Sequence, residues 1–246
     1  MSAAPFVFAA MGTMVSLATT YPLDRATQDA VLEAFAELED RFTLWRPDAE
    51  GARFARRELA LRDASPEFRS VYVAAAEWRL ATGGAFTPHR PDGAVDLSGI
   101  VKGLAIERAG DVLTEHGISD FCLNAGGDVL TAGGAGPGRP WVVGVVDPED
   151  RGRLLSQITT GPGRRAVATS GSAERGEHVW RIGADATFTQ VTVAADDIVT
   201  ADVLATAILA GGPSTIDLAH DLAPIEVLAH ARDGRLWASG AFLVAA

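Results

Sequence analysis

Cysteine is almost absent from this sequence of 246 residues, in which Cys122 stands alone. A single cysteine excludes an intrachain disulfide and any zinc site built on several cysteines. No apolar run approaches the roughly 20 residues that a membrane-spanning helix needs, so no membrane partner is predicted. The first residues lack a basic stretch and a small-residue cleavage site after an apolar run. We therefore predict no signal peptide and expect a cytoplasmic protein.

Positive charge is also scarce, since 21 lysine and arginine residues face 32 aspartate and glutamate residues for a net charge of -11. Such a chain lacks the broad basic surface that neutralises a nucleic-acid backbone, so no nucleic-acid partner is expected. A small phosphorylated ligand is still compatible, because a few local groups or a metal can hold it. The chain is rich in apolar residues, at 48%, which suffices for one large domain or two closely packed lobes.

The spacing of apolar residues predicts three helices in the first half of the chain. Apolar side chains at intervals of three and four residues indicate a helix over 24–42. Ser65-Pro66-Glu67 supplies a capping hydroxyl, a proline and an acid, and starts a second helix that ends at Gly83-Gly84. A third helix is expected over 100–116.

Short apolar segments predict that strands dominate the second half. Residues 5–16 read as a first strand, bent or bulged at Met11-Gly12-Thr13. Further strands are predicted at 121–123, 142–146, 158–160, 165–169, 179–182 and 190–194, helices at 200–209 and 214–220, and a final hairpin of 225–228 and 236–238. Helices first and mostly strands later favour an α+β fold with antiparallel sheet over a doubly wound parallel sheet.

One segment that could carry chemistry is Asp96 to Gly103, at the start of the third helix. Free backbone N–H groups at a helix start favour an anionic group such as a phosphate. Lys102 lies further along the helix, on a face that could point at the same ligand. The alternative is a capped helix with an exposed lysine, and spacing alone favours it because caps are far commoner than sites.

A second segment places Asp202 and Thr206 four residues apart on a predicted helix. Residues at this spacing are neighbours on one helical face. A carboxylate and a hydroxyl oxygen there could share a hard cation such as Mg²⁺. In the alternative, Asp202 caps the helix and Thr206 bonds back to the main chain. The residues alone leave both interpretations open.

A third segment is the glycine pair Gly126-Gly127, which lies between a buried strand and Asp128. Two residues without side chains let a ligand or another backbone segment come close. The same pair is typical of a tight turn, and taken alone the pair favours that interpretation.

Taken in this order, the segments resemble the ApbE family of flavin transferases, the FAD:protein FMN transferases. The resemblance runs from Met11 to about Gly212 and covers 11–13, 42–45, 84–86, 96–103, 123–128, 166–171, His178 and 201–207. It implies a two-lobed, T-fold-like α+β architecture with antiparallel sheets flanked by helices and FAD in a cleft between the lobes. It also implies that residues 1–246 form a single domain of this kind.

The resemblance further implies Mg²⁺-dependent cleavage of the FAD pyrophosphate. FMN would pass to a threonine or serine hydroxyl of an acceptor flavoprotein, and AMP would leave. Asp202 and Thr206 would be metal ligands, helped by main-chain oxygens near Gly99 and Ala205. Asp202 and His178 would be catalytic, with His178 assisting proton removal from the acceptor hydroxyl. The residues implied to line the flavin nucleotide are Met11, Trp45, Ala85, Phe86, Thr87, Asp96 and Lys102.

The sequence departs from the family pattern in three places, one of which is a very short connection to Asp96 that resembles a compact subgroup. Thr87 stands where the family usually has aspartate, and the residues after His178 lack the usual Asp-Pro-x-Thr-Gly element. Trp180, in that altered loop, either stacks on a flavin or adenine ring or is a strand-core aromatic. Two other functions therefore stay open: a member that binds FAD or another adenine nucleotide without transfer, and an FAD pyrophosphatase in which water replaces the protein hydroxyl.

Overall fold

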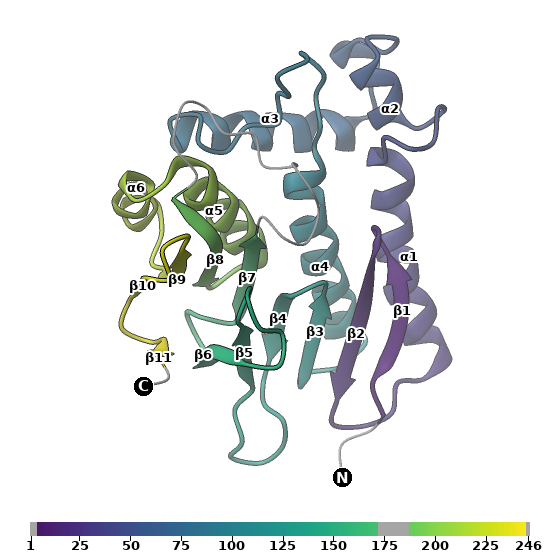
Figure 1. Cartoon of the computed structure of the whole chain (residues 1–246). Coiled ribbons are helices and arrows are strands. Elements are labelled where there is room, and N and C mark those ends of the chain that lie inside the picture. Colours follow the sequence, from purple (N-terminus) through teal and green to yellow (C-terminus); the bar gives the residue numbers. More distant parts are fainter. Residues whose placement is uncertain (1–3, 172–186, 245–246) are drawn as a thin grey trace.

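The computed structural model describes residues 4–171 and 187–244. An antiparallel sheet in the order β1-β2-β3-β4-β7-β8-β9-β10 runs through the molecule, and a smaller sheet has the order β11-β6-β5 (Figure 1). The strands of the large sheet are β1 (Phe6–Ala10), β2 (Thr13–Thr19), β3 (Phe121–Ala125), β4 (Asp128–Ala132), β7 (Ala166–Gly171), β8 (Phe188–Ala195), β9 (Glu226–Ala231) and β10 (Leu236–Ala238). The small sheet comprises β5 (Val142–Val146), β6 (Leu154–Thr159) and β11 (Leu243–Val244).

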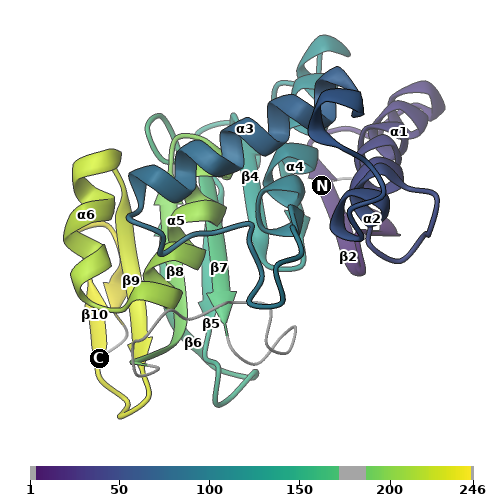
Figure 2. The ribbon, with the colours of Figure 1, turned by 90° about the horizontal axis from the view of Figure 1, so that it is seen from above.

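The helices gather on one face of the large sheet, and the small sheet covers part of the other face (Figures 1 and 2). The helices are α1 (Arg25–Phe42), α2 (Glu50–Ala55), α3 (Pro66–Ala81), α4 (Ser98–Glu115), α5 (Ile198–Gly211) and α6 (Ser214–Leu222), with a short 3₁₀ turn at Leu61–Asp63. α3 crosses from the side of α5 and α6 to that of α2 (Figure 2). None of the helices within the described ranges has the length and apolar character needed to cross a membrane.

Alternation along the strands divides the apolar side chains between two cores. On β4, Leu130 belongs to the core beneath the helices, whereas its neighbour Val129 packs with the small sheet. On β7, Ala166 and Val167 divide in the same way. Side chains two residues away from Leu130 or Ala166 therefore also face the helices.

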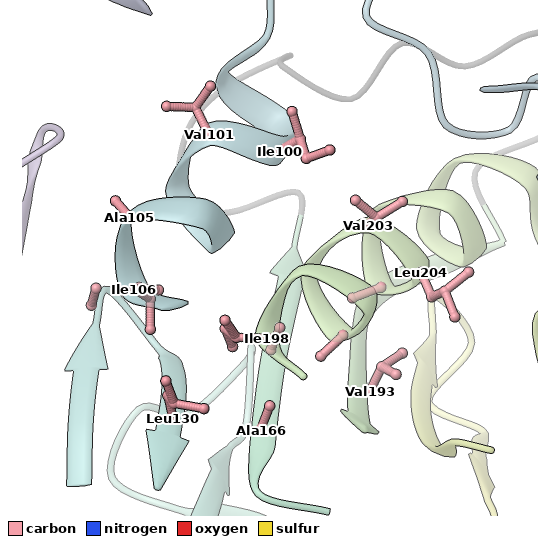
Figure 3. Close-up of a cluster of buried hydrophobic side chains, with 14 of the residues drawn as sticks. Ile100, Val101, Ala105, Ile106, Leu130, Ala166, Val193, Ile198, Val203 and Leu204 are labelled. Atoms are coloured by element: carbon pink, nitrogen blue, oxygen red, sulfur yellow. The ribbon is translucent and has the colours of Figure 1, made fainter. Parts of the chain in front are cut away.

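Helices α4 and α5 pack against each other over the middle of the sheet, where Ile100, Ile106, Leu130, Ala166, Ile198 and Val203 meet (Figure 3). Gly103 permits this close approach, because a Cβ added there would lie 3.2 Å from Val199 Cα. α5 is buried on nearly every side, which explains its continuous apolar sequence. Polar residues on the facing sides of these helices, such as Lys102 and Asp202, are therefore held in the interior.

Most of the predicted elements are confirmed, and the capping residues explain where the helices begin. The side chain of Asp24 accepts a hydrogen bond from Thr27 N at 2.8 Å, and Ser65 accepts one from Phe68 N at 3.2 Å. The order of helices and antiparallel strands confirms the α+β class. The predicted strand at 179–182 lies outside the described residues.

The prediction of one bent strand over residues 5–16 is wrong. Ala10 pairs with Thr13, and Met11 and Gly12 form a two-residue turn between β1 and β2. Both turn residues have positive φ, 50° and 70°, the conformation of the turn that joins twisted antiparallel strands. The prediction missed the turn because methionine rarely adopts this conformation. It also missed β4, α2 and β11, which are short or carry few apolar residues.

Candidate functional site

Two hairpin turns lie beside each other at one end of the large sheet. Gly126 and Gly127, both with positive φ, form the two-residue turn between β3 and β4. Gly126 N donates a hydrogen bond to Met14 O at 3.2 Å, and a Cβ on Gly126 would meet Thr13 Oγ1 at 2.5 Å. The glycine pair is thus a tight turn that also admits the side chain of the neighbouring hairpin.

Asp128 follows this turn as the first residue of β4 and projects to the helix side, like Leu130 two residues later. Its side chain is fully buried. One oxygen, Oδ1, accepts a hydrogen bond from Thr169 N on β7 at 2.9 Å. The other, Oδ2, accepts one from Lys102 Nζ on α4. Asp128 therefore ties three elements together at the edge of the helix-covered face.

Lys102 connects Asp128 to a second buried carboxylate. Its Nζ lies 3.5 Å from Asp202 Oδ1 on α5, and its side chain is only 12% exposed. Lys102, Asp128 and Asp202 are called the two-carboxylate cluster below. The alternative of an exposed lysine is wrong, because packing of α4 on α5 directs this side chain inward. Lys102 is also the only lysine in the chain.

Asp202 lies one turn inside α5 and does not cap it. The cap is Asp197, whose side chain accepts a hydrogen bond from Thr200 N at 2.7 Å. Thr206 Oγ1, one turn beyond Asp202, pairs with Ser170 Oγ of β7 at 3.0 Å. Asp202 Oδ2 is buried and has no hydrogen-bond partner among the residues that the structure describes. A buried carboxylate oxygen left in this state is costly unless a ligand satisfies it.

The oxygens around Asp202 fit a hard divalent cation. A carboxylate oxygen without a partner stands on the same helix face as the Thr206 hydroxyl, and Ser170 adds a second hydroxyl. Within the described ranges, no three histidine, cysteine, aspartate or glutamate side chains form a metal-binding group. Hydroxyl, main-chain or substrate oxygens would therefore have to complete such a site, which is the usual situation for Mg²⁺ at a phosphate.

The predicted main-chain ligands, Gly99 and Ala205, lie on α4 and α5, the helices that carry Lys102 and Asp202. Gly99 is in the first turn of α4, where a Cβ would approach the Phe86 ring at 3.3 Å. Ala205 is fully buried on α5, directly before Thr206. Their roles as ligands stay predictions.

The segment before α4 brings several predicted flavin-binding residues to one region. Asp96 Oδ1 accepts a hydrogen bond from Ser98 N at 2.9 Å, and Thr87 Oγ1 accepts one from His89 N at 3.2 Å. Phe86 is 3% exposed and belongs to the core, so its ring supports the start of α4. Ala85 lies against the end of α5, because a Cβ on Gly211 would meet Ala85 Cβ at 3.0 Å.

Met11 and Trp45 are not part of the two-carboxylate cluster. Met11 lies in the turn after β1, and Trp45 lies in the segment after α1. Met11 N donates a hydrogen bond to Glu39 Oε2 of α1 at 2.8 Å, which holds the positive-φ turn against that helix. Trp45 follows α1 and is 90% exposed, so the part of the chain that the structure describes covers little of it. His178 and Trp180 lie outside the described residues.

Sequence reasoning missed Asp128 and Ser170 as individual site residues, although both lie in segments that it singled out. The sequence feature that could have indicated Asp128 is an acidic residue directly after the glycine pair Gly126-Gly127. Cys122, by contrast, offers no nucleophile, since burial raises the pKa of its thiol to about 11.

Comparison with known proteins identifies the family of the chain. The model of the ApbE family matches residues 11–90 and 89–229. The chain is 39% identical to an FAD:protein FMN transferase of Rhodobacter capsulatus over 94 residues, which are 38% of this chain and 17% of that protein. It is 34% identical to one of Klebsiella pneumoniae (strain 342) over 82 residues, 33% of this chain and 23% of that protein. The matched regions thus span less than a quarter of either relative.

Solved structures share the whole fold. The flavin transferase ApbE from Vibrio cholerae superposes with a TM-score of 0.81 at 22% identity, covering 98% of each chain. The ApbE protein from Thermotoga maritima gives a TM-score of 0.79 at 22% identity, covering 97% of each chain. Family model and fold agree over nearly the whole sequence, and the chain belongs to the ApbE family.

Proposed function

We propose that this protein transfers FMN from FAD to a threonine or serine hydroxyl of an acceptor flavoprotein and releases AMP. The observation that carries the proposal is the buried Asp202 oxygen, which has no partner in residues 4–171 and 187–244 and lies beside Thr206 and Lys102 in a chain of this family. Relatives named FAD:protein FMN transferase support the choice of reaction.

In this proposal, Asp202 and Thr206 hold Mg²⁺, with main-chain oxygens of Gly99 and Ala205. A bound Mg²⁺ would offset negative charge on the pyrophosphate. Lys102 contributes a fixed positive charge close by, and Asp128 holds it there. The start of α4, after Asp96, is also the positive end of that helix dipole, which favours a phosphate of the substrate.

The chemistry is a phosphoryl-type transfer. The acceptor hydroxyl oxygen forms a bond to the phosphorus of the FMN moiety, and the bond from that phosphorus to the oxygen shared with AMP breaks. The hydroxyl proton passes to a base, for which we propose His178, and AMP departs with the bridging oxygen. Met11, Trp45, Ala85, Phe86, Thr87 and Trp180 remain the residues proposed to shape or line the flavin nucleotide site.

The direct test is one incubation of the protein with FAD, Mg²⁺ and an acceptor domain of the kind the family modifies. Flavin fluorescence on the acceptor band of a denaturing gel, with an equal amount of AMP, is the expected result. Asp202→Asn should give neither product. Asp111→Asn, an exposed substitution on α4 that removes the same charge, is the matched control and should transfer normally.

Other outcomes point to the two alternative functions. AMP with free FMN, in an experiment that includes several acceptor domains, would indicate an FAD pyrophosphatase in which water takes the place of the hydroxyl. Saturable quenching of FAD fluorescence without AMP would indicate a flavin-binding member. The absence of the Asp-Pro-x-Thr-Gly element after His178 is the sequence feature that motivates these alternatives.

A further inference from the structure

The two-carboxylate cluster carries an incomplete charge balance. Asp128 and Asp202 are 0% and 5% exposed in their side chains, and one ammonium, that of Lys102, lies between them. The cluster therefore keeps a net charge of about -1 when all three groups are ionised, in surroundings that solvate charge poorly. Both oxygens of Asp128 have partners, and the oxygen without one is Asp202 Oδ2.

The Lys102 ammonium lies closer to one carboxylate than to the other, so the two carboxylates have different roles. Lys102 Nζ is in direct contact with Asp128 and stands 3.5 Å from Asp202. Asp128 is itself fixed by Thr169 N at 2.9 Å, so it cannot follow the ammonium toward α5. Lys102 is consequently drawn away from Asp202, which leaves much of the Asp202 charge for another cation.

The choice of residue supports this interpretation. Apart from five histidines, the other basic residues of the chain are all arginines, and the one lysine is placed here. An arginine fork would bind a carboxylate through two parallel hydrogen bonds, whereas an ammonium is a compact point charge that can be shared unequally between two acceptors.

We propose that Asp128 is a positioning residue that sets the divalent-cation affinity of Asp202 by holding Lys102 away from it. Without the Asp128 charge, Lys102 would move onto Asp202 and compete with the cation. This inference rests on the proposed function in that the cation concerned is the one assigned to Asp202 and Thr206.

The test is a double-mutant cycle read by Mn²⁺ binding to the whole protein without FAD, with free Mn²⁺ followed by electron paramagnetic resonance. Asp128→Asn keeps the acceptor for Thr169 N and should weaken Mn²⁺ binding roughly 10-fold or more, as carboxylates behind a metal ligand commonly do. Lys102→Met should tighten binding, because it removes a competing cation. In the Lys102→Met background, Asp128→Asn should have a clearly smaller effect than in the wild type.

Several results would overturn the proposal. An effect of Asp128→Asn that is equal or larger in the Lys102→Met background would mean that Asp128 acts on the cation directly. Weaker binding in Lys102→Met, or no saturable Mn²⁺ binding to the wild type, would also contradict it. Thermal unfolding checks that each variant is folded, and Lys102→Gln replaces Lys102→Met if the latter is not. Asp111→Asn serves as the charge control and should leave Mn²⁺ binding unchanged.

The cycle and the FMN-transfer assay can fail independently. Wild-type protein that transfers FMN but gives an additive cycle retains the proposed function and loses this inference. Wild-type protein that gives the expected cycle but releases no AMP loses the proposed function and retains the cation-positioning role of Asp128.

Discussion

Two buried aspartates on opposite faces of the large sheet have opposite surroundings. Asp147, after β5 of the small sheet, is 0% exposed. Its Oδ1 accepts a hydrogen bond from Glu149 N at 2.8 Å, and its Oδ2 accepts one from Arg153 Nε at 2.8 Å. Asp202, between α5 and the sheet, has Lys102 near one oxygen and no partner in the described structure for the other.

The difference indicates that the Asp147 carboxylate has a structural role and that the Asp202 carboxylate is available to a ligand. Buried polar atoms in folded proteins are nearly always paired, so a fully paired Asp147 is explained by its own turn. The Asp202 oxygen that has no partner among the described residues is instead available to a group that binds there. Substitution should therefore affect stability at Asp147 and function at Asp202, and the following experiments examine that contrast.

The largest effect is expected for Asp202→Asn, which should lower AMP release from FAD by roughly a thousandfold, equivalent to several kcal/mol of lost charge stabilisation. The melting temperature should stay the same or rise, because the variant removes a buried charge. AMP chromatography and a thermal scan measure the two quantities. A variant that releases AMP normally would end the assignment of Asp202 as a metal ligand.

Asp147→Asn should reverse that pattern. It weakens the charged hydrogen bonds to Arg153, and we expect a loss of about 1–3 kcal/mol in the free energy of unfolding. AMP release should be unchanged, since Asp147 lies on the face away from the helices. Urea unfolding at pH 7 measures the loss. Equal stability of variant and wild type would show that the Arg153 pair contributes little.

The effect of Asp147 should also depend on pH. Burial raises the pKa of Asp147, but the Glu149 N–H and Arg153 outweigh it and hold the pKa below its ordinary value of 3.8. A carboxyl whose pKa is lower in the folded state stabilises the fold above its unfolded pKa and loses that contribution as pH falls through the folded value. The stability difference between wild type and Asp147→Asn should be full at pH 6 and shrink below about pH 4. A difference that grows in acid would contradict this sign.

The smallest effect is expected for Ser170→Ala. This variant removes the 3.0 Å hydrogen bond to Thr206 and should cost about 0.5–1.5 kcal/mol in stability. Mn²⁺ affinity should change by no more than a few-fold, because Asp202 keeps its charge. Urea unfolding and a Mn²⁺ titration test both values. A loss of Mn²⁺ binding as large as that of Asp202→Asn would instead make Ser170 a principal ligand.

The sequence predicted best what depends on neighbours along the chain. Capping at Asp24 and Ser65, and the Asp202–Thr206 pair on one helix face, follow from spacing of a few residues. The contact of Lys102 with Asp128 spans 26 residues and depends on how α4 packs over β4. Local patterns do not contain that information, so spacing alone favours an exposed Lys102 and does not single out Asp128.

The β1–β2 turn illustrates a different reason for failure. Its positive-φ Met11 is held by Glu39 of α1, so a tertiary contact stabilises a conformation that the local sequence disfavours. Trp45 is a further example. It lies in a segment matched to the family, yet it is 90% exposed in this structure. Its predicted role at the flavin stays a prediction.

Because Lys102 is the one lysine of the chain, its ammonium group can be observed without overlap from other lysine signals. Every ε-ammonium signal of the chain originates at one place, between two buried carboxylates of α5 and β4. Lysine labelled with ¹⁵N at Nζ alone would therefore yield a single resonance that reports on the two-carboxylate cluster, with no assignment needed. The packing of α4 against α5 thus places the one lysine signal of the protein where a change in the charge around Asp202 would shift it.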